Sequence, residues 1–542
     1  MALGVERNGF KKMRPHVLIG SLIVALLCTS EAALAQKNGG VLRMFHRDNP
    51  PSASIHEEST ASTVVPFMPV FNNLVLFDQA KLQNSEDTIV PDLAESWSWN
   101  DDGTELTFKL RKGVRWHDGL PFTSSDVECT FGLLTGRNRD KLRRNPRAAW
   151  YRNINYVHSS GDHEVTIYLN RPQPSLLSLL ASGFSPIYPC HIPAAQMRVR
   201  PIGTGPFKFD SFVQFDRVKL VRNPDYWKPK RPYLDGIEFT IVSSPQTALL
   251  SFLAGRFDIT FPWEVTIPQL REARRPSSRV VCETASMNNN TNLLVNRHAA
   301  PFDNPDIRRA LSLALDRKAF IAAVNGGEGE IGGTLQPQGD GLWGMPPERL
   351  AAIEGYGPDV VENRELARAL MAKAGYDQNN RLQMKVATRG IALYRNPSQI
   401  LIDQLREIHI HATLDVVETS HWFTRLNRKD YSVAVNTTGN GVDDPDQAFY
   451  ENFSCRSERN YNGYCNPEIE RLFDVQSSEP DIEKRRQLVW DIDAKLLADG
   501  ARPPIMWNRA ATCWQPYVRG YVSHTNSMYN GFRLEDVWLD RP

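Results

Sequence analysis

The sequence predicts an α/β fold of two or three domains, and three features of the chain predict it. Short segments in the first third alternate apolar and polar residues, as half-buried strands do. In the second half, helical segments alternate with strands, which is the pattern of an α/β layer. A length of 542 residues with 41% hydrophobic residues is enough for more than one packed core.

The first 35 residues have the features of a secretory signal peptide. Lys11, Lys12 and Arg14 give a positive start, and residues 17–28 are almost wholly apolar. This run is shorter than the roughly 20 residues of a spanning helix, so we expect a cleaved signal rather than the alternative, a membrane anchor. The small-x-small pattern at 33–35 places cleavage before Gln36.

The first third of the mature chain is expected to be rich in strands. A glycine pair at 39–40 precedes the first strand, and the turn signal at 101–103 precedes the second. The expected strands are 41–45, 106–110, 165–169 and 237–241. The period then becomes helical from 245 to 255, where Gly255 is a typical helix end.

The second half is expected to be more helical. Asn304 is a capping residue followed by a proline in the first turn, and it opens a helix over 306–315. Further helices are expected at 364–374, at 398–407 and from Asp481 onward, with strands at 383–387 and 413–417 between them.

Charge and motifs argue against several classes of function. The chain has 63 basic and 62 acidic residues, of which four and two lie in the signal segment, so the mature chain is nearly neutral. This balance argues against a nucleic-acid partner. Neither G-x-S-x-G nor H-E-x-x-H occurs, which argues against a hydrolase. His409 and His411 share a strand face but lack further ligands, so we expect no metal site and no cofactor.

Six cysteines remain after the signal peptide, at positions 129, 190, 282, 455, 465 and 513. An even number in an exported protein favours disulfides. Cys455 and Cys465 are the best pair because they bracket a short polar turn. The partners of the other four remain open.

The segment 437–446 is the expected functional centre. It contains Asp443, Asp444 and Asp446, together with Gly439, Gly441 and a proline that make it a loop. Three carboxylates within four positions suit the capture of a cationic group such as an amine. The alternative is an Asx-type turn, in which the carboxylates cap their own backbone.

Several sequence blocks occur together in a fixed order. They are PDLAESW (91–97), FKLRKGVRWHDG (108–119), GTGPF (203–207), RNPDYW (222–227), PFD (301–303), RRALSLALDR (308–317) and AGY (374–376). In these blocks and their spacing the chain, from residue 40 to its end, resembles the extracytoplasmic solute-binding proteins of the dipeptide/oligopeptide/nickel class (family 5), which serve ABC importers.

The resemblance implies a two-lobed periplasmic-binding-protein fold of type II, a clam-shell that buries its ligand between the lobes. It also implies an extra domain inserted in the first lobe. The expected boundaries are 1–35 for the signal peptide, 36–75 with 199–283 and 508–542 for lobe I, 76–198 for the extra domain, and 284–507 for lobe II.

The resemblance also implies roles for particular residues. Asp444 stands where dipeptide-binding relatives place an aspartate against the α-ammonium group, with Asp443, Asp446 and Gly441 beside it. Arg389, or alternatively Arg395, stands nearest to the arginine that binds the peptide carboxylate. The Cys455–Cys465 pair matches a bridge of those relatives. A zwitterion buried between lobes needs both charges matched, because an unpaired buried charge costs several kcal/mol.

The expected function is that of a monomeric periplasmic receptor that captures dipeptides or short peptides and delivers them to a membrane permease. Alternatives within the same role are an opine, another amino-acid conjugate or chelated nickel. A secreted hydrolase is a more distant alternative.

Overall fold

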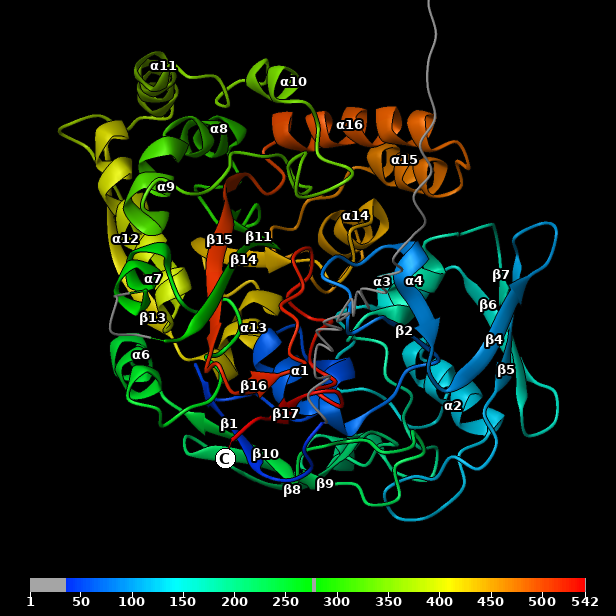
Figure 1. Cartoon of the computed structure of the whole chain (residues 1–542). Coiled ribbons are helices and arrows are strands. Elements are labelled where there is room, and N and C mark those ends of the chain that lie inside the picture. The colour runs from blue at the N-terminus through cyan, green and yellow to red at the C-terminus, as the bar shows by residue number, and fades with distance from the viewer. Residues whose placement is uncertain (1–35, 275–278, 542) are drawn as a thin grey trace, which may run out of the picture. The chain divides into compact units, whose positions relative to one another are not determined.

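A computed structural model describes residues 36–274 and 279–541, and the chain from Lys37 onward forms one compact unit. The expected signal peptide lies outside the described residues. Within the described ranges, no helix combines the length and the apolar character needed to cross a bilayer. Three larger sheets organise the chain (Figure 1).

The first sheet lies in the ranges expected for lobe I. Its strand order is β1-β10-β9-β8, with β1 parallel to β10 and the other pairs antiparallel. The strands are β1 (Val41–His46), β8 (Phe207–Val213), β9 (Arg217–Arg222) and β10 (Gly236–Ile241). The accompanying helices are η1 (Ile55–Glu57), α1 (Ala61–Phe67), η2 (Met68–Val70), α6 (Pro245–Leu253) and α7 (Ile267–Ala273).

The second sheet lies in the range expected for the extra domain and has the order β4-β5-β7-β6, all antiparallel. The alternation of apolar and polar residues that predicted β5 is confirmed as a burial pattern, since Leu106, Phe108 and Leu110 are all buried. The strands of this region are β2 (Val75–Phe77), β3 (Ile89–Pro91), β4 (Ala94–Trp99), β5 (Glu105–Leu110), β6 (Ile154–Ser159) and β7 (Glu164–Leu169). The helices are η3 (Glu86–Thr88), α2 (Ser124–Leu134), α3 (Ala148–Tyr151), α4 (Leu176–Ala181) and α5 (Ala194–Met197).

The third sheet has the order β13-β12-β14-β11-β15. Most of it lies in the range expected for lobe II, and β11 and β15 extend beyond that range. Its strands are β11 (Val281–Val295), β12 (Leu382–Arg389), β13 (Ile410–Val417), β14 (Val433–Gly439) and β15 (Pro504–Trp514). The helices are α8 (Pro305–Leu313), α9 (Arg317–Asn325), α10 (Pro347–Ala351), α11 (Val360–Lys373), α12 (Ala392–Leu405), η4 (Arg406–Ile408), α13 (Thr419–Asn427), α14 (Pro445–Phe453), α15 (Pro467–Ser477) and α16 (Ile482–Ala498).

Local sequence signals explain most helix starts. The Asn304 side chain caps α8 as expected, and Asp481 caps α16. Helix α12 begins six residues before the expected start at Ser398 and contains Pro397. Tyr394 is buried in an edge-to-face contact with Trp422, and this packing supports the additional first turns of the helix.

Two antiparallel strands continue from the third sheet toward lobe I. The half of β11 from Asn289 onward pairs with β14, whereas its first half pairs only with β15, opposite residues 509–514. That end of β15 also forms bridges with Ile259 and Val265 of lobe I. The ladder is irregular between Ser286 and Asn290, so the connection between the lobes is a strand pair with a bulge rather than a free linker.

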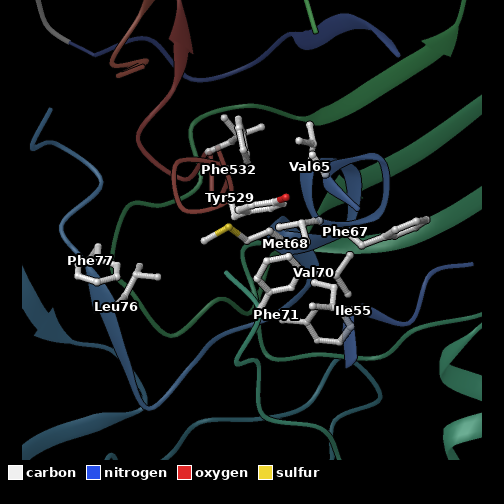
Figure 2. Close-up of a cluster of buried hydrophobic side chains, with 14 of the residues drawn as sticks. Ile55, Val65, Phe67, Met68, Val70, Phe71, Leu76, Phe77, Tyr529 and Phe532 are labelled. Carbon is white, nitrogen blue, oxygen red and sulfur yellow. The ribbon is translucent and has the colours of Figure 1, made fainter. Parts of the chain in front are cut away.

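The C-terminal residues return to lobe I. Strands β16 (Val518–Arg519) and β17 (Trp538–Leu539) pair with each other. Tyr529 and Phe532 lie among buried side chains from residues 55–77, including Met68 and Phe71 (Figure 2). The buried Arg533 guanidinium donates to Asp92 at 2.9 Å, which fixes the tail to the extra domain.

The structure joins Cys455 to Cys465, as expected. It also resolves the four cysteines that the sequence left open, pairing Cys129 with Cys190 and Cys282 with Cys513.

Candidate functional site

Segments of both lobes enclose a pocket of about 260 Å³. Lobe I contributes the region of α6 and α7, including Trp263 and Glu264, while lobe II contributes the end of α9 and the start of α12. Arg509 lies on β15, the strand that crosses from one expected range to the other. Because the two lobes meet around this space, relative movement of the lobes would open or close it. We call it the α6/α12 pocket.

Among the described residues, the charged groups at the α6/α12 pocket are paired with each other or with nearby residues, whereas one buried amide is not. Arg47 donates to the carboxylate of Glu264 at 3.2 Å, and burial raises the pKa of that carboxyl despite the arginine. Arg509 is paired with Asp340 at 2.9 Å. The buried amide nitrogen of Asn325 has no hydrogen-bond partner among the described residues. Since its charges are paired, the pocket suits an uncharged, hydrogen-bonding part of a ligand.

A second interlobe pocket, of about 550 Å³, is lined by the acidic loop. Segments 83–87 and 174–178 face segments 339–343, 442–444 and 479–485 across it. Six carboxyl groups line it, from Glu86, Asp87, Asp340, Asp443, Asp444 and Glu479, against the single guanidinium of Arg485. The excess of negative charge favours a cation. We call it the acidic pocket.

Asp444 has a structural role at the edge of this pocket. Its side chain caps α14 by accepting from the backbone N–H of Asp446 at 2.9 Å. Both carboxylate oxygens also accept from Arg485, at 3.0 and 2.9 Å, and this side chain lies over the Trp343 ring. Burial raises the pKa of Asp444 to about 6, against the opposing effect of Arg485. Its charge is therefore matched without a ligand.

Asp446 does not face a ligand space, since its side chain is fully buried. Its carboxylate accepts from Ser175 at 2.6 Å, from Ser477 at 2.6 Å and from Gln476 at 2.5 Å. Ser175 lies in the range expected for the extra domain and the other two lie at the end of α15, so Asp446 links segments from two expected ranges through hydrogen bonds.

Asp443 is the aspartate of the loop without an ion-pair partner among the described residues. One carboxylate oxygen accepts from the backbone N–H of Leu342 at 3.1 Å, and Asp443 lines the acidic pocket. Burial, reinforced by the nearby charge of Asp444, raises the pKa of Asp443 to about 7. A positive group placed beside it would favour the ionised form.

Gly441 lies where the loop touches lobe I. Its carbonyl accepts from Asn530 at 2.7 Å, and its N–H donates to Gln447 at 2.7 Å. A Cβ atom here would stand 3.2 Å from the Phe184 ring, so glycine permits the close approach of the loop to the extra domain.

Arg389 lies at the end of β12 and is fully buried. Its Nη2 donates to Asp48 at 2.5 Å, and Asp48 follows β1 of lobe I. The expected alternative, Arg395, is exposed. The guanidinium expected to meet a ligand carboxylate is thus already paired with a carboxylate of the protein.

Sequence reasoning missed an asparagine-rich part of the interface. Asn288, Asn289 and Asn290 lie at the bulge of β11, all buried, and Asn288 accepts from the backbone N–H of Asn440 at 2.9 Å. Three consecutive asparagines are unusual in a strand because asparagine has low strand propensity. The run 288–290 was the available signal.

A buried cluster of charges was also missed. Glu451 of α14 is fully buried and paired with Arg459, and the charge of Arg147 from the extra domain acts on it. Arg147 itself donates to the carbonyl of Glu58 at 2.9 Å. Arg147 and Glu58 are distant in sequence from Glu451 and Arg459, so no local pattern predicts that the cluster forms.

The three sheets, the crossing strand pair and the pockets between lobes define a two-lobed solute-binding architecture. Residues 88–460 match the model for bacterial extracellular solute-binding proteins, family 5 Middle. The chain belongs to this family, which confirms the family and the fold class inferred from the sequence blocks.

Individual relatives agree with this assignment. The chain is 29% identical to a probable di/tripeptide-binding protein 5 of Pseudomonas aeruginosa, over 83% of this chain and 87% of the relative. It is 25% identical to the dipeptide-binding protein of Escherichia coli, over 84% and 86%.

Solved structures share the fold. The binding protein DppA from Helicobacter pylori in complex with the peptide STSA superposes with a TM-score of 0.80, at 21% identity, covering 93% of this chain and 99% of that one. The binding protein AgaA in complex with agropinic acid gives 0.81 at 21% identity, with the same coverage.

Proposed function

We propose that this chain is a periplasmic receptor that binds a short peptide or peptide-like solute between its lobes and delivers it to the permease of an ABC importer. The observation that carries this proposal is that both interlobe pockets take their lining from both lobes, so closure around a hinge would enclose a solute. The names of the curated relatives, which are di- and tripeptide-binding proteins, support a peptide as the first ligand class.

Within the acidic loop we assign the cationic end of the ligand to Asp443. Asp444 and Asp446 have side-chain partners within the protein, whereas among the described residues the carboxylate of Asp443 accepts from one backbone N–H and lines the acidic pocket. A ligand ammonium group at Asp443 would supply the counter-charge that the protein lacks there. Asp444 would act indirectly, by holding the loop.

A second ligand class is an opine or another amino-acid conjugate. The similarity to AgaA in complex with agropinic acid agrees with this class. Nickel would have to arrive with its own chelator, since the described residues contain no group of three or more His, Cys, Asp or Glu side chains arranged for a metal.

The role we propose is binding without catalysis, by an exported monomer that carries no cofactor. The signal segment 1–35 supports export. The near-neutral charge of the mature chain supports a small solute rather than nucleic acid as the partner.

Thermal unfolding in the presence of dipeptides, opines and nickel–histidine tests the proposal. A ligand at 100 times its dissociation constant should stabilise the folded state by ~2.7 kcal/mol. Asp443→Asn should weaken an amine-bearing ligand by roughly 1.5–3 kcal/mol, as for a lost charge-assisted hydrogen bond. Mass spectrometry of the incubated ligands provides the control. Conversion of a ligand to product, or no stabilisation by any member of the panel, would count against a receptor of this kind.

A further inference from the structure

The pair of Asp48 and Arg389 connects the lobes inside the protein. Asp48 lies just beyond β1 of lobe I, and Arg389 ends β12 of lobe II, 341 positions later. Both side chains are almost completely removed from water. Thr419 of α13 donates to the same Asp48 oxygen at 2.7 Å. The junction is therefore formed only when the lobes are together.

The guanidinium of Arg389 is fully engaged by the protein. Its Nε donates to Thr419 at 2.8 Å, its Nη1 to the hydroxyl of Tyr394 at 3.4 Å, and its Nη2 to Asp48 and to Ser62 at 3.2 Å. The rings of Tyr394 and Phe423 lie beside it. Each nitrogen has an acceptor, so a second carboxylate would have to displace one of these partners.

Asp48, in contrast, has one unsatisfied oxygen. Its Oδ2 accepts from Arg389 and Thr419, whereas its buried Oδ1 has no hydrogen-bond partner among the described residues. The nearest charged groups do not fill this role. The His46 ring lies 3.8 Å from Oδ1, and burial lowers its pKa to about 4, so it is neutral at neutral pH. Arg47 is paired with Glu264. A buried acceptor without a donor is a place for a donor from outside.

We propose that Asp48 determines the specificity of this receptor by serving as the internal counter-ion of Arg389, so that the lobes close on solutes that bring a hydrogen-bond donor, and not a carboxylate, to this junction. The inference rests on the proposed function, because it concerns the solute bound between the lobes. A ligand carboxylate here would compete with Asp48 for Arg389 and would be repelled by the negative charge of Asp48. An amide, amine or hydroxyl group of the ligand would donate the missing hydrogen bond to Oδ1 of Asp48.

The inference has a consequence that needs no ligand. Asp48→Asn leaves the buried guanidinium without its carboxylate, and an uncompensated buried charge disfavours the closed arrangement by several factors of ten. Small-angle X-ray scattering of the empty protein should therefore show a larger radius of gyration for Asp48→Asn than for the natural chain. The double variant Asp48→Asn/Arg389→Gln removes both charges and should scatter like the natural chain.

A pair of probes tests the specificity directly. Alanyl-alanine carries a free carboxylate, and alanyl-alanine amide carries a donor in its place. The natural chain should bind the amide at least as well as the acid, whereas Asp48→Asn should shift the ratio of the two dissociation constants toward the acid by about tenfold or more. The double variant should lose this shift.

Asp415→Asn is the matched control, because Asp415 pairs with Arg425 within lobe II at 2.6 Å and both remain partly exposed. It should change neither the scattering nor the ratio. Scattering of Asp48→Asn identical to that of the natural chain overturns the inference, as does an unchanged ratio of dissociation constants. If neither probe binds any form, the proposed peptide ligand fails, while the scattering of the empty protein still decides the role of Asp48.

Discussion

Replacing Asp444 by alanine should destabilise the protein rather than merely weaken a ligand. The Asp444 side chain caps α14 and also binds Arg485 through both oxygens, at 3.0 and 2.9 Å. The substitution therefore removes two interactions at once, and it leaves the largely buried Arg485 facing a pocket that it shares with Trp343.

The two losses differ in size. Loss of an N-cap aspartate costs ~1 kcal/mol. Removal of one member of a buried ion pair costs roughly 3–5 kcal/mol, because the other charge stays uncompensated. Asp446 remains within 3.5 Å of Arg485 and supplies part of the missing charge, which reduces the second loss. We expect a total of about 3 kcal/mol in the free energy of unfolding.

Urea unfolding followed by tryptophan fluorescence measures this loss, since Trp343 packs on Arg485 and reports on the region. Asp443→Ala is the matched control, because the carboxylate of Asp443 itself has no ion pair among the described residues, so its removal should not lower the unfolding free energy. The double variant Asp444→Ala/Arg485→Met should recover part of the stability. If Asp444→Ala keeps its unfolding free energy and instead loses ligand affinity, Asp444 is a ligand contact, as its position in the sequence first suggested.

Three further predictions follow from the same contacts. Asp443 has a pKa near 7 in the folded protein against 3.8 for an ordinary aspartate, so its ionisation should reduce stability as pH rises from about 4 to 7. Asp443→Asn should thus stabilise the empty protein by ~1–2 kcal/mol at pH 8 and little at pH 4; equal unfolding free energies of both forms at pH 8 would contradict this. Replacing Cys455 and Cys465 by serine should cost ~2–3 kcal/mol in denaturant unfolding, as expected for a short closed loop, whereas opening the bridge from Cys282 to Cys513, with a separation of 231 residues, should cost more. Gly439→Ala would place a Cβ 2.6 Å from the Tyr529 hydroxyl of lobe I. Ligand affinity should fall severalfold, because this contact hinders closure of the lobes. Unchanged affinity would show that the Tyr529 side chain moves aside freely.

The sequence predicted the fold well where the signals are local. Alternating residues such as Leu106 and Phe108 mark a strand in any context, and Asn304 followed by proline marks a helix start. The GTGPF block is tightly constrained by packing, since a Cβ at Gly203 would lie 2.0 Å from the carbonyl oxygen of Val70. Such constraints identify a family from sequence and need no knowledge of the ligand.

The candidate site was predicted less completely, for a physical reason. Position in the loop identified Asp443 and Asp444 together, but the sequence could not show that Arg485, from a helix 41 positions away, neutralises Asp444. Arg389 was identified by its place at a strand end, yet its partner Asp48 comes from the other lobe. Which carboxylate keeps a free charge depends on contacts between distant segments, and these exist only after folding.

The strand pair of β11 and β15 has a mechanical consequence. Cys282 and Cys513 stand opposite each other on the lobe I side of the bulge and are covalently linked. The two strands therefore cannot slide past each other at that end, and bending is confined to the irregular stretch around Asn288. We therefore expect rotation of one lobe on the other to bend the strands at Asn288, which also contacts Asn440 and Val442, so the expected axis of movement lies beside the acidic loop.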